Sequence, residues 1–93
     1  MSINEILDER LKTHGAFNSQ AITSQDMKIV MRNSRNWSSL ESTHREALDM
    51  IAHKIARILN GDHTHVDHWD DIAGYATLVS RYHTSFLGNQ KDR

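Results

Sequence analysis

Five carboxylate residues are spaced in a way that could bind a divalent metal ion. Glu46 and Asp49 form an E-x-x-D pair, Asp67 and Asp70 form a D-x-x-D pair farther along the chain, and Asp71 follows directly. Side chains three or four residues apart lie on one face of a helix, so each pair can share one ion. Magnesium prefers a few carboxylate oxygens together with water and substrate phosphates. The spacing therefore indicates a magnesium site that grips a triphosphate, and the alternative is an ordinary charged helix surface.

Basic and aromatic residues near these acids suggest how a nucleotide would be held. Lys54 and Arg57 lie between the two acidic pairs and could neutralise phosphate oxygens. Gly74 falls inside an expected helix, where glycine costs about 1 kcal/mol relative to alanine. A glycine at such a position usually lets another helix or a ligand approach the backbone. The neighbouring Tyr75 would accordingly stack on a base or pack against that helix.

Three of the seven histidines, His63, His65 and His68, cluster around a short link between two expected helices. Imidazole side chains suit zinc, nickel or copper. A structural zinc site needs four well-placed ligands, and the chain has no cysteine to contribute one. We therefore interpret these histidines as solvated loop residues.

Helices must position these groups, because the chain has no proline and only four glycines, the residues that interrupt helices most strongly. Ser2 and Glu5 form a capping box that opens the first helix, and Gly15 offers a stop for it. Either Ser39 or Ser42 can cap the third helix. The expected helices span about residues 3–13, 19–32, 40 or 43 to 60, and 67–86.

Apolar residues recur at helical spacing and predict which helix faces are buried. The residues expected to be buried are Ile22, Met27, Val30, Met31, Leu48, Ile51, Ala52, Ile55, Ile58, Leu59, Trp69, Ile72, Ala73, Ala76 and Val79. Four helices with short links predict an all-α fold, an antiparallel bundle of about four helices. A chain of 93 residues has room for one domain, which we place at residues 1–88, followed by a polar tail at residues 89–93.

Size and charge limit the classes of partner and function. A core this small gains from self-association, which predicts a homo-oligomer that completes the bundle. The formal net charge of −1, with acids and bases interspersed, argues against a nucleic-acid partner and a helix-turn-helix protein. No apolar stretch approaches membrane-spanning length, and the first residues do not form a secretory signal. We therefore expect no membrane association and a cytoplasmic location in a bacterial host cell.

Three segments of the sequence resemble a known family. The run EALDMIAHKIARILNG, the following DHWDDIAGYATLV and the earlier ERLKTHGAF resemble a family of small phage and prophage proteins. That family is related to the nucleotide-modification-associated domain and is more distantly similar to the MazG-like all-α nucleoside triphosphate pyrophosphohydrolases. The resemblance covers about residues 6–79 of the chain.

The resemblance implies a nucleotide site that works with magnesium. The residues it implies for substrate binding are Arg10, His14, Lys54, Arg57 and Tyr75, and those for the metal are Glu46, Asp49, Asp67, Asp70 and Asp71. The first four of these acids match the MazG-like pairs E-x-x-E and E-x-x-D, with aspartate in place of glutamate at positions 49 and 67. A second departure is Ala16, where the small phage family often has an acid.

Two functional hypotheses follow. In the first, a phage-derived, MazG-like helical protein binds (deoxy)nucleoside triphosphates with magnesium, and hydrolysis to monophosphate and pyrophosphate would make it an enzyme. In the second, the same helices form a non-enzymatic phage module that binds a host protein. Acids that converge in one cleft would favour the first hypothesis, whereas scattered acids beside an open apolar patch would favour the second.

Overall fold

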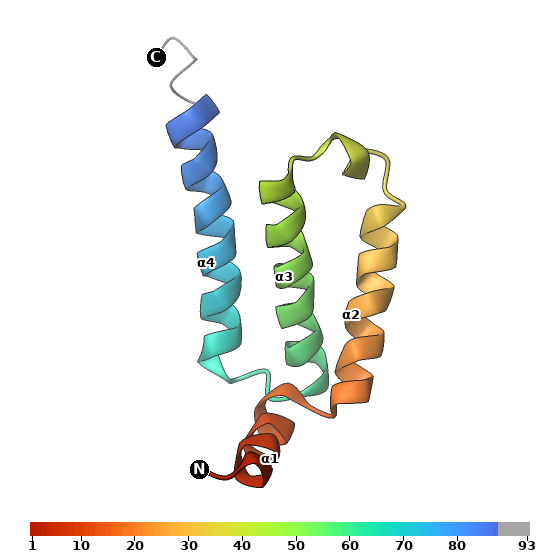
Figure 1. Cartoon of the computed structure of the whole chain (residues 1–93), viewed down its shortest axis with the longest axis vertical. Helices are drawn as coiled ribbons and strands as arrows, with labels where there is room; N and C mark the ends of the chain where they lie inside the picture. The colour runs from red at the N-terminus through yellow and green to blue at the C-terminus, as the bar shows by residue number, and fades with distance from the viewer. Residues whose placement is uncertain (88–93) are drawn as a thin grey trace.

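The computed structural model describes residues 1–87, and every regular element in that range is helical (Figure 1). The elements are α1 (Ile3–His14), α2 (Phe17–Arg32), a 3₁₀ turn (Trp37–Ser39), α3 (Ser42–Asn60), α4 (Val66–Tyr82) and a π-helical turn (His83–Leu87). The all-α prediction with four α-helices is therefore confirmed. The tail expected at residues 89–93 lies outside the described residues. None of the helices within residues 1–87 is both long and apolar enough to cross a bilayer.

Helix ends follow local capping chemistry. At α1, the Glu5 amide donates to Ser2 Oγ at 3.2 Å, and the Ser2 amide donates to Glu5 Oε1 at 3.4 Å, which confirms the capping box. At α3, the predicted serine cap is wrong, because Glu41 is the N-cap residue. Its carboxylate accepts from the His44 amide, and its own amide donates to His44 Nδ1 at 3.2 Å. Ser39 is instead part of the preceding 3₁₀ turn.

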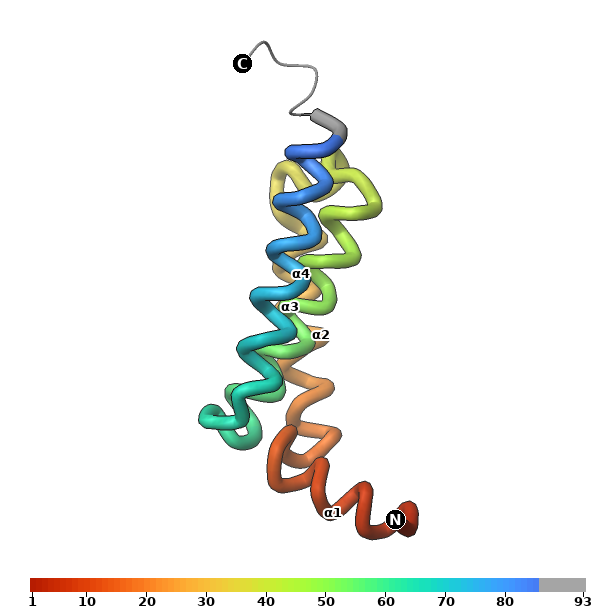
Figure 2. Tube along the Cα trace, turned by 90° about the vertical axis from the view of Figure 1, so that its left-hand side faces the viewer, coloured from red at the N-terminus to blue at the C-terminus, as the bar shows by residue number. Residues whose placement is uncertain are grey.

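The three long helices form a layer with α3 in the middle. Figure 1 shows α2, α3 and α4 side by side, and Figure 2, turned by 90°, shows them one behind another with α1 extending from the lower end. Helix α3 packs against both α2 and α4, which agrees with both views. The described chain measures 54 × 29 × 21 Å along its principal axes. One chain is thus an open layer of three helices with α1 across one end, rather than a closed bundle.

Burial differs from the sequence prediction because this layer is open. Within residues 1–85, the buried apolar residues are three alanines of α3, Ala47, Ala52 and Ala56. Several residues that were expected to be buried are exposed, namely Ile22, Val30, Leu48, Leu59, Trp69, Ala73 and Ala76. Val30, for example, keeps 68% of its surface. Helical spacing identifies an apolar face, but no element within residues 1–87 covers it.

The upper end of the layer is fastened by polar contacts between α3 and the end of α4. His44 Nε2 and His83 Nε2 lie 2.7 Å apart, and the Tyr82 hydroxyl donates to the Glu41 carboxylate. The loop before α3 packs through Trp37, whose ring lies 5.5 Å from the guanidinium of Arg32. These contacts hold the start of α3 against the end of α4, and the loop before α3 against the end of α2.

A close backbone contact fastens α1 to the lower end of α3. The Asp62 amide donates to the Thr13 carbonyl oxygen at 3.0 Å. A Cβ atom on Gly61 would lie 2.4 Å from that same oxygen, and one on Gly15, where φ is +81°, would lie 2.0 Å from the Asn60 oxygen. Only glycine fits at either position, because the two backbones touch. This contact holds α1 in place beside α3.

Candidate functional site

A pocket of about 390 Å³ lies where α1, the start of α2 and the second half of α3 meet. We call it the cationic pocket and define it by Arg10, His14, Phe17, His53 and Arg57, which line it together with Leu7, Asp8, Leu11, Gly15 and Gln20. Arg10 and His14 are four residues apart on α1, and His53 and Arg57 are four apart on α3. Each pair therefore shares one helix face, and the glycine contact turns the two faces toward one pocket.

Two arginines bring positive charge to this pocket, and among residues 1–87 neither forms an ion pair with Asp8, the carboxylate that lines it. Burial lowers the pKa of Arg57, the charge of Arg10 lowers it further, and Asp71 partly offsets these effects. The Arg57 Nε is buried and has no hydrogen-bond partner within the described part of the chain. No ion pair among residues 1–87 includes Arg10 or Arg57. Since buried polar groups are normally satisfied, this arrangement is suited to an anionic ligand.

The two histidines of the pocket are neutral at pH 7. Burial, followed by the charge of Arg57 and the neighbouring His68, lowers the pKa of His14 to about 4. Burial and Arg57 also lower the pKa of His53. Each imidazole can therefore offer one N–H donor and one nitrogen acceptor to a ligand without adding charge.

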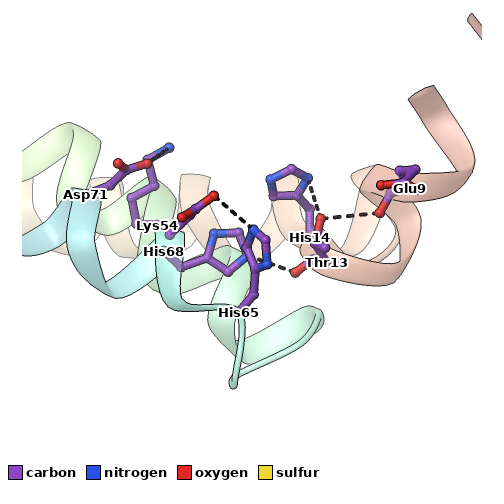
Figure 3. Close-up of polar contacts among 8 residues, drawn as sticks. Glu9, Thr13, His14, Lys54, His65, His68 and Asp71 are labelled. Atoms are coloured by element: carbon purple, nitrogen blue, oxygen red, sulfur yellow. Dashed lines mark hydrogen bonds and ion pairs between the residues drawn. The ribbon is translucent and has the colours of Figure 1, made fainter. Parts of the chain in front are cut away.

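Lys54 lies at the α3–α4 contact rather than on the pocket wall. Its side chain is buried, and its Nζ lies 3.0 Å from Asp71 Oδ2 (Figure 3). That hydrogen bond is the main reason why the pKa of Asp71 is lowered. The pair ties α4 to α3, and the ammonium group also adds to the positive field that lowers the pKa of His14.

His68 has a structural role that the sequence did not reveal. It is only 1% exposed, so its assignment as a solvated loop residue is wrong. Its Nε2 lies 2.8 Å from the Thr13 carbonyl oxygen, the same atom that accepts from the Asp62 amide. Its ring centroid lies 5.0 Å from that of His14 and 4.7 Å from that of His65. Figure 3 shows the three imidazoles near one another. His68 therefore connects the start of α4 to α1.

The five predicted metal ligands do not gather in one chain. Asp49 lies 3.2 Å from Arg32 of α2, with its Oδ1 buried and unpartnered, and Asp67 lies 3.6 Å from His65 Nε2. Asp71 pairs with Lys54, while Glu46 and Asp70 are exposed. Across the part of the chain that is described, no three acidic or histidine side chains are placed to hold a metal ion. Within residues 1–87 the five acids therefore form no shared cluster of three or more metal ligands.

Tyr75 and Gly74 belong to a different surface. Together with Asp70, Asp71, Leu78 and Arg81 they line a shallow groove formed entirely by α4. A Cβ atom on Gly74 would meet nothing within 4 Å, so no other part of the described chain requires this glycine. The structure thus brings Arg10, His14 and Arg57 together but leaves Tyr75 apart from them.

Phe17 and His53 were missed by the sequence reasoning. Phe17 begins α2, lines the pocket and is 73% exposed. The sequence signal for Phe17 was its position two residues after Gly15. The glycine that ends the first helix sets the direction of the chain that follows, and so places Phe17 near that helix end. His53 is four residues before Arg57 and shares its helix face, so the spacing of α3 could have included it.

A comparison with known families assigns the chain to one of them. A family model described as a domain of unknown function (DUF6378) matches residues 3–83, so the chain belongs to this family. The matched region contains every residue of the cationic pocket and the whole layer of helices α2, α3 and α4. No curated protein and no solved structure matches the chain.

Proposed function

We propose that this member of the DUF6378 family binds a nucleoside triphosphate in the cationic pocket. One observation carries the proposal: Arg57 lies beside Arg10, and its buried Nε has no partner within residues 1–87. Two neighbouring guanidinium groups repel each other unless an anion lies between them. A triphosphate supplies several oxygens in the fork geometry that arginine prefers.

The apolar wall of the same pocket suits a nucleobase. Leu7, Leu11 and Phe17 line the pocket beside the arginines. Stacking on an aromatic ring contributes about 1–3 kcal/mol per base, whichever base it is. The pocket volume also falls within the range of about 300–1,000 Å³ that is usual for small-molecule sites. Phosphates on the arginines and a base on Phe17 would therefore use both parts of the pocket.

Magnesium enters the proposal as the ion that accompanies a triphosphate. It is usually bound by substrate phosphates, by water and by only one or two carboxylates, so it does not require a complete protein cage. The carboxylates within residues 1–87 form no such cage, so the phosphates and water would supply most of the ligands of the ion. Hydrolysis to monophosphate and pyrophosphate, and a phage origin, rest on the resemblance to phage and MazG-like proteins alone. Assembly as a homo-oligomer is a separate proposal, supported by the apolar side chains that α2, α3 and α4 leave exposed.

The second candidate function is a phage module that binds a host protein. The scattered acids and the exposed apolar side chains favour it, including Ile29 and Leu78 at 56% and 61% exposure. Contiguous exposed apolar surface usually marks an interaction site. This candidate does not account for the unpaired arginines, which is why we place it second.

Isothermal titration with a panel of ribo- and deoxynucleoside triphosphates, with and without magnesium, tests the proposal. We expect binding by the wild-type chain and at least a tenfold weaker affinity for Arg57→Ala, because a charge-assisted hydrogen bond to phosphate contributes about 1.5–3 kcal/mol. Arg35→Ala is the matched control, since Arg35 is exposed in the loop after α2 and distant in sequence from the pocket residues. Pyrophosphate release in the same mixtures reports on hydrolysis.

Two outcomes would count against the pocket. Absence of binding across the panel would remove the nucleotide proposal and leave the host-protein module. Equal losses for Arg57→Ala and Arg35→Ala would mean that binding depends on overall charge rather than on this site. Binding without pyrophosphate release would support nucleotide binding and exclude hydrolysis of the nucleotides in the panel.

A further inference from the structure

One face of the helical layer is apolar along all three long helices. Leu48, Ile51 and Ile55 form a stripe on α3. A groove of about 340 Å³ separates this stripe from α2, and a groove of about 320 Å³ separates it from α4. Both grooves share Leu48 and Ile51, so they belong to one continuous surface. We call this surface the apolar face; its other lining residues are Met27, Val30, Met31, Leu40, His44, Ala47, Ala52, Ala76 and Val79.

The apolar face and the cationic pocket lie on opposite sides of α3. Successive residues turn by about 100° around a helix, so Arg57 lies about 160° from Ile55. Their lining residues confirm the separation, since the grooves of the apolar face share no residue with the pocket. A partner can therefore cover the apolar face while the pocket stays open to a ligand.

The solvent-accessible surface of the chain is larger than that of a compact monomer of the same size. The chain exposes 6805 Å², whereas a compact monomer of this size exposes about 5,500 Å². The radius of gyration is 16.1 Å, against about 12 Å for a compact domain of this length. If each of two chains buried the excess of about 1,300 Å², their interface would total about 2,600 Å², within the range of obligate homodimers. Among residues 1–85 the buried apolar residues are three alanines, so burial within one chain contributes little hydrophobic stabilisation.

The architecture favours a second copy as the partner. Stable domains need two packed layers of secondary structure, and each chain supplies one layer. Among residues 1–87 no further element is free to fold over the face, because α1 is fixed at the lower end by the glycine contact. The lining residues include no lysine, arginine, aspartate or glutamate, so nothing on the face selects a charged partner. A stripe with spacings of three and four residues packs well against a copy of itself.

We propose that a second copy of this chain covers the apolar face, so that the folded unit is a two-fold homodimer. The two α3 stripes meet at its centre, and the two cationic pockets face outward. The contact builds the missing core from Leu48, Ile51 and Ile55 of both chains. This inference does not depend on the nucleotide proposal, because it concerns the opposite side of the layer.

The first test is the molar mass of the full chain by light scattering during gel filtration. We expect twice the mass of one chain for the wild type and for Leu78→Asp, which places a charge on the outer groove of α4. Leu48→Asp should give the mass of one chain or an unfolded chain, since it places a charge in the dimer core. A monomeric wild type, or a Leu48→Asp variant that remains a dimer, would overturn the proposal.

A second measurement decides the matter even if Leu48→Asp does not fold. Isotope-filtered NMR on a mixture of methyl-labelled and unlabelled wild-type chains detects only contacts between copies. We expect intermolecular contacts at the methyl groups of Leu48, Ile51 and Ile55. Contacts confined to Leu78 of α4 or to Leu7 of α1 would show a different dimer and contradict the proposal.

Discussion

Replacing Gly61 by alanine should open the contact that holds α1 against α3. The new Cβ would lie 2.4 Å from the Thr13 oxygen and 2.5 Å from the His14 carbonyl carbon, closer than real Cβ contacts allow. Both neighbouring atoms are backbone, so the helices themselves must separate. The Thr13 oxygen then loses its two donors, the Asp62 amide and the His68 imidazole. At about 1 kcal/mol for each hydrogen bond, the free energy of unfolding should fall by about 2 kcal/mol.

Gly74→Ala is the matched control, because it is the same chemical change at a glycine with open space around it. The added Cβ meets nothing within 4 Å, and alanine is favoured over glycine inside a helix by about 1 kcal/mol. The two variants should therefore shift the urea midpoint in opposite directions from the wild type. Both unfolding curves are measured by circular dichroism at one protein concentration, since a dimer's stability depends on concentration.

Two results would contradict these expectations. If Gly61→Ala is as stable as the wild type, the two backbones are not in contact and α1 is not fixed beside α3. If Gly74→Ala is destabilised instead, something outside the described chain approaches the outer surface of α4, and the apolar face is not the whole interface. Gly61→Ala should also weaken triphosphate binding, because Arg10 and His14 reach the pocket only through the position of α1.

Three further predictions concern the pocket and the helix contacts. Folding lowers the pKa of His14 from 6.5 to about 4, so the unfolded chain binds more protons between these two pH values. Thermal stability should therefore decrease as the pH falls from 6.5 to 4, and His14→Gln should flatten that decrease. An unchanged pH profile in the variant would contradict the burial of His14. Asp71→Asn should lower the free energy of unfolding by about 1 kcal/mol in urea titrations, because it leaves the buried Lys54 without its carboxylate partner. An unchanged free energy of unfolding would mean that this ion pair does not hold α4 against α3. Phe17→Ala should weaken triphosphate affinity about tenfold, and it should not unfold the chain because Phe17 is 73% exposed. Ile29→Ala, at a residue that is 56% exposed, should leave the affinity unchanged. Equal effects of the two variants in calorimetry would exclude stacking on Phe17.

Much of the fold follows from local sequence signals. The Ser2 and Glu5 capping box and the Gly15 stop placed the first helix correctly because these contacts involve neighbouring residues only. The start of α2 was expected at about residue 19 but lies at Phe17, because Ala16 caps it without a side-chain hydrogen bond and leaves no signal. Burial was predicted less well, since helical spacing shows which face is apolar but not what covers it.

The candidate site shows the same division between local and long-range information. The resemblance to the phage family implied Arg10, His14 and Arg57 as binding residues, and these three line one pocket. The carboxylate pairs share helix faces as their spacing requires, yet the pairs do not converge. Asp49 faces Arg32 of α2, and Asp71 faces Lys54. Such cross-helix pairing depends on how the helices rotate against each other, which the spacing along one helix does not determine.

The most direct test of the cationic pocket is a titration of the ¹⁵N-labelled full chain with a nucleoside triphosphate and magnesium, followed by amide and arginine side-chain NMR. We expect the largest shifts at Arg10, His14, Phe17, His53 and Arg57, with the Arg57 Nε–H signal moving most because it gains a hydrogen-bond partner. Absence of shifts, or shifts centred on the outer groove of α4 that Tyr75 lines, would contradict the account.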